Sequence, residues 1–202
     1  VLKNKSDASF GSRYIIDPFS VDVNISGIWH FQSCNHTKQC CLAAAGLIGA
    51  AYLALCAAFP ALSFGQIQVR FAEVFTLLPL FTPAGIWGVT IGCALSNIYG
   101  LALGTNIIGI WDIFLGTGAT FVAAVLTYKF RDIQFRGLPI LSALMPVLLN
   151  ALVVGGELTM VMSPTFDLRI FWLNFGSVGL GEFIACFVIG LPLYRYLQSS
   201  GL

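Results

Sequence analysis

Four acidic side chains lie within or at the ends of long apolar runs of this sequence: Glu73, Asp112, Glu157 and Glu182. An ionised group near the centre of a bilayer costs on the order of 3 kcal/mol or more, so such a residue usually faces a cavity or a partner. A carboxylate can accept hydrogen bonds from two adjacent donors, and two carboxyl groups can divide the roles of general acid and base. The acids therefore predict a polar binding site or an intramembrane acid–base centre.

A cation and several amides accompany these acids. In "LSFGQIQVRFAEVFTLLPLF", Gln66, Arg70 and Glu73 are spaced four and three apart. A helix would bring them to one face and allow Arg70 to pair with Glu73. The amides within or near apolar segments are Asn97, Asn150 and Asn174. Asn150 and Glu157 are seven apart, so they share a helix face.

Other kinds of chemistry are disfavoured by the sequence. No histidine follows His36, which argues against a histidine base or a histidine-based metal site inside the membrane. No phosphate-binding loop of the G-x-x-x-x-G-K-[ST] type is present, so this sequence cannot hydrolyse ATP by that route. The cysteines nearest the histidines, Cys34, Cys40 and Cys41, fit no standard zinc-ligand spacing. We therefore expect no metal, no cofactor and a binding role rather than catalysis.

The composition places these side chains in a membrane. Of the 202 residues, 57% are hydrophobic and 9% are charged, and the mean hydropathy is +0.86. Soluble chains carry roughly a quarter charged residues. The net charge of +1 gives no reason to expect nucleic-acid binding. From about residue 40 onward, the apolar runs are long enough to cross a bilayer, which takes roughly 20 residues per helix.

Six apolar segments must position the polar residues. They cover roughly 39–59, 66–81, 84–103, 109–128, 138–162 and 171–197, and the second is short for a full span. They predict an all-α membrane protein, a six-transmembrane-helix bundle that forms one substrate-binding domain over residues 39–199. Residues 1–38 are polar and carry both histidines. We expect this part to be a disordered tail or a misassigned start.

The cationic residues orient this bundle. With a cytoplasmic N-terminus, the inner face receives Lys38, Lys129, Arg131, Arg136 and Arg195, and the outer face only Arg70 and Arg169. Cytoplasmic loops are enriched in Lys and Arg, so both termini are predicted to be cytoplasmic. The acids and amides then converge on the outer halves of their helices. This convergence predicts a polar pocket open to the outside, unless these groups only form interhelical contacts that fix the bundle.

The first apolar segment carries a stripe of small residues. Gly46, Ala50, Ala54 and Ala58 recur every four residues. Such a stripe lets a second helix approach closely in a membrane. It could pack against helices of the same chain or serve as a docking face for a separate membrane subunit.

Four stretches of the sequence resemble the QueT family. They are "LSFGQIQVRFAEVFTLLPLFTPAGIWGVTIGCALSN", "WDIFLGTGATFVAAVLTYKF", "PVLLNALVVGGEL" and "GSVGLGEFIACFVIGLPLYRYL". They occur in order and cover roughly residues 40 to 197, so the polar N-terminal part is unmatched. Members of this family are substrate-binding membrane subunits (S components) of energy-coupling factor (ECF) transporters for queuosine precursors.

The resemblance implies a multi-pass protein of the cell membrane that is not itself an enzyme. It would capture a 7-deazaguanine derivative from outside and associate with a transmembrane coupling subunit and two ATPase subunits. The small-residue stripe would then be the docking face for the coupling subunit. Alternatives are an S component for another vitamin-like substrate, an intramembrane enzyme that uses Glu and Asp, and a scaffolding membrane protein.

The candidate ligand can be compared with the residues. A guanine-like edge offers two adjacent N–H donors beside a carbonyl, and an aminomethyl substituent adds a cation. Glu73 or Glu157 would accept the donor pair, another acid would lie near the amine, and Trp111 would stack on the base. The candidate substrate-binding residues are Arg70, Glu73, Asn97, Trp111, Asp112, Asn150, Glu157 and Glu182.

Overall fold

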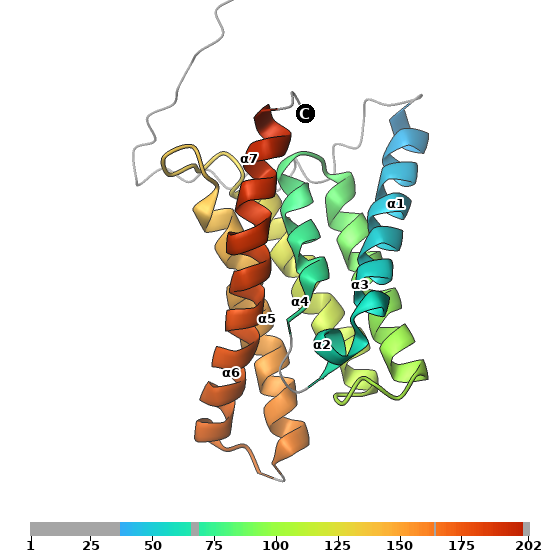
Figure 1. Ribbon diagram of the computed structural model, residues 1–202, viewed down its shortest axis with the longest axis vertical. Helices are drawn as coiled ribbons and strands as arrows, with labels where there is room; N and C mark the ends of the chain where they lie inside the picture. Colours follow the sequence, from blue (N-terminus) through green and yellow to red (C-terminus); the bar gives the residue numbers. More distant parts are fainter. Residues whose placement is uncertain (1–36, 66–68, 164, 200–202) are drawn as a thin grey trace, which may run out of the picture. The chain divides into compact units, whose positions relative to one another are not determined.

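The computed structural model describes residues 37–65, 69–163 and 165–199, and within them it is built from helices (Figure 1). In chain order these are α1 (Thr37–Ala58), α2 (Pro60–Phe64), η2 (Phe71–Leu80), α3 (Ala84–Ala102), α4 (Ile110–Lys129), α5 (Ile140–Met162), α6 (Leu168–Phe183), η3 (Ile184–Gly190) and α7 (Leu191–Ser199). The η2 element is a 3₁₀-helix and η3 is a π-helix that joins α6 to α7. No strand occurs in these ranges, which confirms the predicted all-α fold class.

Five of the helical segments are long and apolar enough to cross a membrane. They are Gln39–Ala58, Ala84–Ala102, Ile110–Lys129, Ile140–Met162 and Leu168–Ser199. Each coincides with a predicted apolar segment to within a few residues. The chain is therefore a multi-pass membrane protein. The prediction for residues 1–38 lies almost wholly outside the described residues.

The second predicted segment, 66–81, does not form a long membrane helix. Residues 66–68 lie outside the described residues, and η2 has ten residues, including Pro79. A 3₁₀-helix rises about 2.0 Å per residue, so η2 covers about 20 Å. The hydrocarbon core of a bilayer is about 30 Å thick. The count of six spans, like the cytoplasmic position of the termini, stays a prediction.

The contact between α1 and α3 nevertheless bears on that count. A Cβ added at Gly88 would meet Ile48 and the Ala45 carbonyl, and one added at Gly92 would meet Tyr52 and the Gly49 carbonyl. Early residues of α1 thus face early residues of α3, and later residues face later ones, so the two helices run parallel. Because α1 and α3 run parallel, the chain between them must run back from the end of α1 to the level at which α3 begins. The α2–η2 segment makes that return.

The return segment lies among the long helices. The η2 element packs against α3, α4, α5 and η3, and the remaining helices pack in sequence as α3 with α4, α4 with α5 and α5 with α6. Figure 1 shows the α3–α4 and α5–α6 connections at one end of these helices and the α4–α5 connection at the other. A polar residue on η2 is therefore surrounded by helices rather than by lipid.

Candidate functional site

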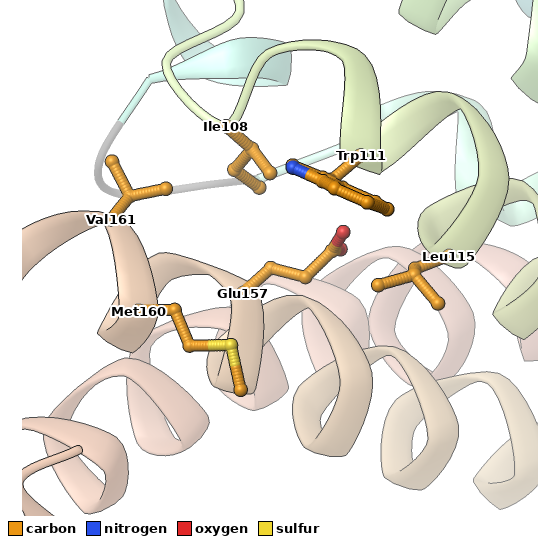
Figure 2. A pocket seen from close by; sticks show the side chains of 6 residues that line it. All are labelled: Ile108, Trp111, Leu115, Glu157, Met160 and Val161. Atoms are coloured by element: carbon orange, nitrogen blue, oxygen red, sulfur yellow. The ribbon is translucent and has the colours of Figure 1, made fainter. Parts of the chain in front are cut away.

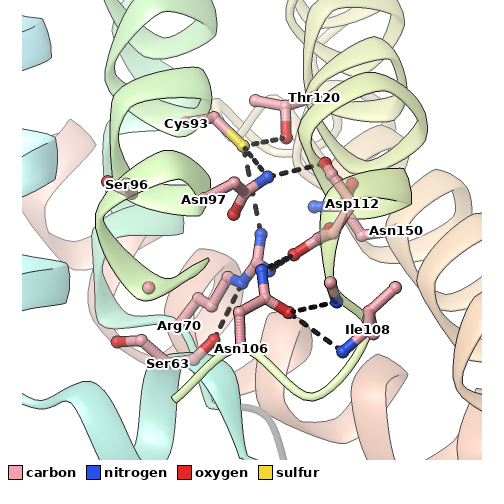
Figure 3. A network of polar contacts seen from close by, with 12 residues as sticks. Ser63, Arg70, Cys93, Ser96, Asn97, Asn106, Ile108, Asp112, Thr120 and Asn150 are labelled. Atoms are coloured by element: carbon pink, nitrogen blue, oxygen red, sulfur yellow. Dashed lines mark hydrogen bonds and ion pairs between the residues drawn. The ribbon is translucent and has the colours of Figure 1, made fainter. Parts of the chain in front are cut away.

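A buried polar network is centred on Asp112, in the first turn of α4 (Figure 3). Its Oδ2 accepts hydrogen bonds from Arg70 Nη2 and Asn106 Nδ2, each at 2.9 Å. Asn97 Nδ2 of α3 donates to the Asp112 backbone carbonyl at 2.8 Å. The network joins the start of η2, the end of α3 and the start of α4.

The expected pairing of Arg70 with Glu73 is wrong, because Arg70 forms its ion pair with Asp112. The prediction assumed one continuous helix, but Arg70 precedes η2 and has an extended backbone, with ψ at 92°. Its Nε donates to the Ser63 carbonyl at 3.0 Å. The guanidinium lies 6.0 Å from the centre of the Phe64 ring. Arg70 thus ties α2 and the start of η2 to α4.

Glu73 belongs to a second buried cluster. The Tyr52 hydroxyl of α1 donates to Glu73 Oε1. Asn150 of α5 donates from Nδ2 to Glu182 Oε1 of α6 at 3.0 Å, and Asn150 interacts with the carboxyl groups of both acids. Glu73, Asn150 and Glu182 are 0%, 2% and 3% exposed. Three elements distant in sequence therefore place two carboxylates around one amide.

Glu157 lines a cavity between the start of α4 and the end of α5 (Figure 2). The cavity has a volume of about 460 Å³ and is lined by Ile108, Trp111, Leu115, Glu157, Met160 and Val161. Figure 2 shows the Glu157 carboxylate directed toward the Trp111 ring. Trp111 is 66% exposed, so it forms the outer wall. Volumes of 300 to 1,000 Å³, an apolar lining and a few polar groups are typical of small-molecule sites.

All three groups contain buried oxygens that have no hydrogen-bond partner among the described residues. Among the residues of the three groups, these atoms are Glu73 Oε2, Asn97 Oδ1, Asp112 Oδ1, Asn150 Oδ1, Glu157 Oε1 and Oε2, and Glu182 Oε2. Each is an amide or carboxylate oxygen that can only accept, unless a carboxyl group is protonated. Buried polar groups are nearly always paired in folded proteins. The arrangement is therefore suited to a ligand that is rich in N–H donors.

The structure brings the predicted residues into neighbouring groups rather than one. Arg70, Asn97 and Asp112 form the first group; Glu73, Asn150 and Glu182 the second; Trp111 and Glu157 the cavity wall. Asn174 lies apart from them and donates to Thr159 Oγ1 at 3.1 Å. Gln66 lies outside the described residues. No cluster of three or more potential metal ligands occurs in the described ranges.

The predicted docking stripe lies on the exposed side of α1. Gly46, Ala50, Ala54 and Ala58 are all exposed, and a Cβ added at Gly46 would have no neighbour within 4 Å. Packing of α1 within the chain uses another face, made by the buried residues Ala45, Gly49, Tyr52 and Cys56. The interpretation that the stripe packs against helices of the same chain is therefore wrong within the described residues.

Two side chains of these polar groups, those of Tyr52 and Asn106, are not predicted by the sequence. Tyr52 lies in the apolar helix α1, where an aromatic residue is expected to pack against its neighbours. Its polar role is seen only in the hydrogen bond from its hydroxyl group to Glu73. Asn106 lies in the α3–α4 connection, where its Oδ1 accepts from the backbone N–H groups of Ile108 and Gly109. Asparagine in a turn is typical of such local bonds. That signal could have placed Asn106 next to Asp112.

Comparison with known proteins identifies the family. A family model described as "QueT transporter" matches residues 42–199, which is more than half of the chain. Neither a search of curated proteins nor a search of solved structures gave a match. The family implies a small-molecule substrate, embedding in a membrane and transport rather than catalysis. The match confirms the resemblance found in the sequence: the chain belongs to the QueT transporter family.

Proposed function

We propose that this chain is the substrate-binding S component of an ECF-type ABC transporter. It captures a queuosine precursor, a 7-deazaguanine derivative, from outside the cell. A transmembrane coupling subunit and two ATPase subunits then drive uptake. The sequence contains no phosphate-binding loop, which suits a subunit whose energy comes from partners.

The unpaired carboxylate of Glu157 is the observation that supports a guanine-like ligand. Both of its carboxylate oxygens lack a hydrogen-bond partner among the described residues, and the side chain lines the cavity beside Trp111. A guanine-like edge presents two adjacent N–H donors, which match one carboxylate bidentately. The aromatic wall provides a surface on which a planar base can stack.

The position of the cavity suits capture from outside. It lies where α4 begins and α5 ends. In the orientation favoured by the cationic residues, these ends face the exterior, whereas the α4–α5 connection with Lys129, Arg131 and Arg136 faces the cytoplasm. A ligand from outside would meet Trp111 first and the Glu157 carboxylate behind it.

The test is calorimetric binding of the purified chain with a panel of 7-deazaguanines and common vitamins. We expect saturable binding of the deazaguanines. Glu157→Gln should weaken that binding about ten- to hundredfold, because it removes a charged acceptor from the paired hydrogen bonds. Asp132→Asn, which removes an exposed acid, is the matched control and should bind as the unaltered chain does.

The alternatives give different results in the same assay. Tighter binding of another vitamin would assign a different substrate to the S component. Conversion of a ligand by the isolated chain, without any ATPase, would favour the intramembrane enzyme. Absence of saturable binding across the whole panel would contradict the proposal.

A further inference from the structure

The connection between α4 and α5, residues 130–139, carries apolar and cationic side chains on one exposed turn. Ile133 is 41% exposed, Phe135 is 65% exposed, and Arg136 is exposed as well. Exposed apolar side chains on a membrane helix face lipid tails, but these two lie beyond the ends of α4 and α5. The hydrocarbon core therefore does not account for their exposure. Ile133, Phe135 and Arg136 are called the loop tip below.

The loop tip stands on a base that is fixed to the rest of the bundle. Gln134 Nε2 donates to the Tyr194 hydroxyl of α7 at 3.2 Å, and the Tyr194 ring lies 5.2 Å from the Phe81 ring. Leu138 packs against the buried cluster that contains Leu77. Figure 1 shows the α4–α5 connection and the end of α7 at the same end of the helices. The base therefore holds the tip at this end of the bundle.

The tip itself is a tight turn. The Phe135 N–H donates to the Leu138 carbonyl at 2.8 Å, and the Leu138 N–H donates to the Phe135 carbonyl at 3.0 Å. The residues between them, Arg136 and Gly137, have φ at 52° and 78°, as a type I′ turn requires. In the described ranges, Arg136 is the only residue other than glycine with a positive φ. Its guanidinium lies 5.6 Å from the centre of the Phe135 ring, so the turn presents an aromatic ring and a cation together.

Cations outnumber acids around the tip. Lys129, Arg136 and Arg195 are exposed and form no salt bridge in the described part of the chain. Arg131 is paired with Asp132 at 3.7 Å, and the Asp132 side chain is 83% exposed. Arg195 belongs to the end of α7 that the base of the loop contacts. This surface therefore favours a partner with negative charge.

A phospholipid with an anionic headgroup matches both kinds of side chain. Basic residues beside a membrane helix are attracted to anionic headgroups, and an apolar ring is stabilised at the boundary between headgroups and acyl chains. The connection is also short: residues 130–139 must run out and back, so their tip lies at most about 17 Å beyond the helix ends. The tip therefore stays near the headgroup layer. A small soluble anion would match only the cations and leave the two apolar side chains in water.

We propose that the loop tip and the cations around it bind an anionic phospholipid, with the Phe135 ring inserted between lipids and Arg136 on the phosphate. Such a contact fixes the depth of α4, α5 and α7 in the leaflet that they face. The site lies apart from the Glu157 cavity and does not depend on which ligand is transported. It therefore goes beyond the proposed function and does not rest on it.

Lipid binding to the full chain tests the proposal. The purified chain in detergent is titrated with phosphatidylglycerol or with phosphatidylcholine, and native mass spectrometry gives the apparent dissociation constant of each lipid. The unaltered chain should bind phosphatidylglycerol at least about fivefold more tightly, the ratio expected for one exposed cation near an anionic headgroup. This preference should fall as the ionic strength rises, because exposed charges are screened by salt.

Substitutions in the turn identify the cation. Arg136→Gly removes the charge and suits a positive φ, because glycine adopts this conformation freely. Its thermal stability should be unchanged or raised, and its preference for phosphatidylglycerol should fall about fivefold. Arg136→Lys keeps the charge and should keep the preference. Arg169→Gln, which removes an exposed cation at the start of α6, is the matched control and should bind both lipids as the unaltered chain does.

A gain of binding gives a result that misfolding cannot imitate. Asp132→Asn removes the acid and releases Arg131 from its ion pair. The affinity for phosphatidylglycerol should therefore rise about fivefold, while the affinity for phosphatidylcholine stays the same. Phe135→Ser should weaken both lipids, because the apolar contact of the ring is common to them.

Four outcomes would overturn the proposal. The first is equal affinity of the unaltered chain for the two lipids. The second is a preference that neither Arg136→Gly nor Asp132→Asn changes. The third is displacement of the lipid by inorganic phosphate at equal concentration, which would assign the cations to a soluble anion. The fourth is an Arg136→Gly chain with unaltered lipid preference and reduced uptake in cells that express the coupling subunit, which would make this surface a contact with a protein.

Discussion

Asp112 is the residue on which the polar network depends. It accepts from Arg70 and Asn106 through one carboxylate oxygen and from Asn97 through its backbone carbonyl. Because the side chain is fully buried, it would be an isolated charge if its ion pair were removed. The network therefore gives Arg70 a positioning role, with no contact to a ligand required.

Arg70→Gln tests this role. We expect the variant to lose about 3–5 kcal/mol of unfolding free energy, the usual cost of leaving one partner of a buried pair uncompensated. Combining it with Asp112→Asn removes both charges and should recover at least half of the loss. The measurement is unfolding in mixed micelles, together with ligand affinity. If the double variant is stable but binds no ligand, Arg70 or Asp112 contacts the ligand directly.

Gly116 offers a second test at the residue scale. A Cβ at this position would collide with Asp112 Oδ1. Gly116→Ala should therefore displace the Asp112 carboxylate and weaken ligand binding and thermal stability. Gly118→Ala, two residues later on α4, adds the same methyl group where no atom lies within 4 Å. This control should be neutral or slightly stabilising, because alanine favours a helix. Equal effects of the two substitutions would contradict the argument.

At the scale of elements, the close contact between α1 and α3 holds the parallel pair together. A Cβ at Gly92 would lie 2.7 Å from Tyr52 Cβ and 3.0 Å from the Gly49 carbonyl oxygen. We expect Gly92→Ala to destabilise the protein by about 1–3 kcal/mol, as overpacking commonly does. Gly46→Ala, on the open side of α1, is the control and should retain stability. Thermal unfolding in detergent measures both variants.

The long helices could be predicted from the sequence because each is an uninterrupted apolar run. The predicted segment 84–103, for example, corresponds to α3, Ala84–Ala102. The 3₁₀ geometry of η2 and the π-helix of η3 could not, because a short apolar run has the same composition whichever way the helix is wound. Both depend on tertiary contacts, such as those that η2 and η3 make with each other.

The candidate site was predictable in its residue types and not in its pairings. Acids and amides inside apolar runs are conspicuous, and all eight predicted substrate-binding residues lie in the three groups described. Their partners are set by tertiary structure: Arg70 and Asp112 are 42 positions apart, and Asn150 and Glu182 are 32 apart. The role of Tyr52 could not be predicted, because its partner Glu73 lies 21 positions away and no helical spacing relates the two.

At the scale of the whole molecule, the acids and the small-residue stripe of α1 lie in different parts of the structure. The acids are buried among helices, whereas the exposed side of α1 presents small side chains. Under the proposed function, the first binds the ligand and the second contacts the coupling subunit. A substitution on the exposed side of α1 should therefore leave ligand binding unchanged.

Ala50→Trp separates the two activities. The large side chain lies on the exposed face of α1, so ligand affinity and thermal stability should be unchanged. Uptake in cells that also express the coupling subunit and ATPases should fall by about tenfold or more, because a bulky residue prevents close helix approach. Leu152→Trp, at an exposed position of α5, is the control and should support uptake. Normal uptake by the Ala50 variant would contradict docking through this face.

The 3₁₀ geometry of η2 also makes this element a spacer of defined length. With three residues per turn, Glu73, Thr76 and Pro79 stand in one straight row, and all three are buried. Rewinding the same ten residues as an α-helix would shorten the element by about 5 Å and turn the row into a spiral. The rise from Glu73 to Pro79 would shrink from about 12 Å to about 9 Å. The winding of a single ten-residue element thus sets the spacing of its three buried residues.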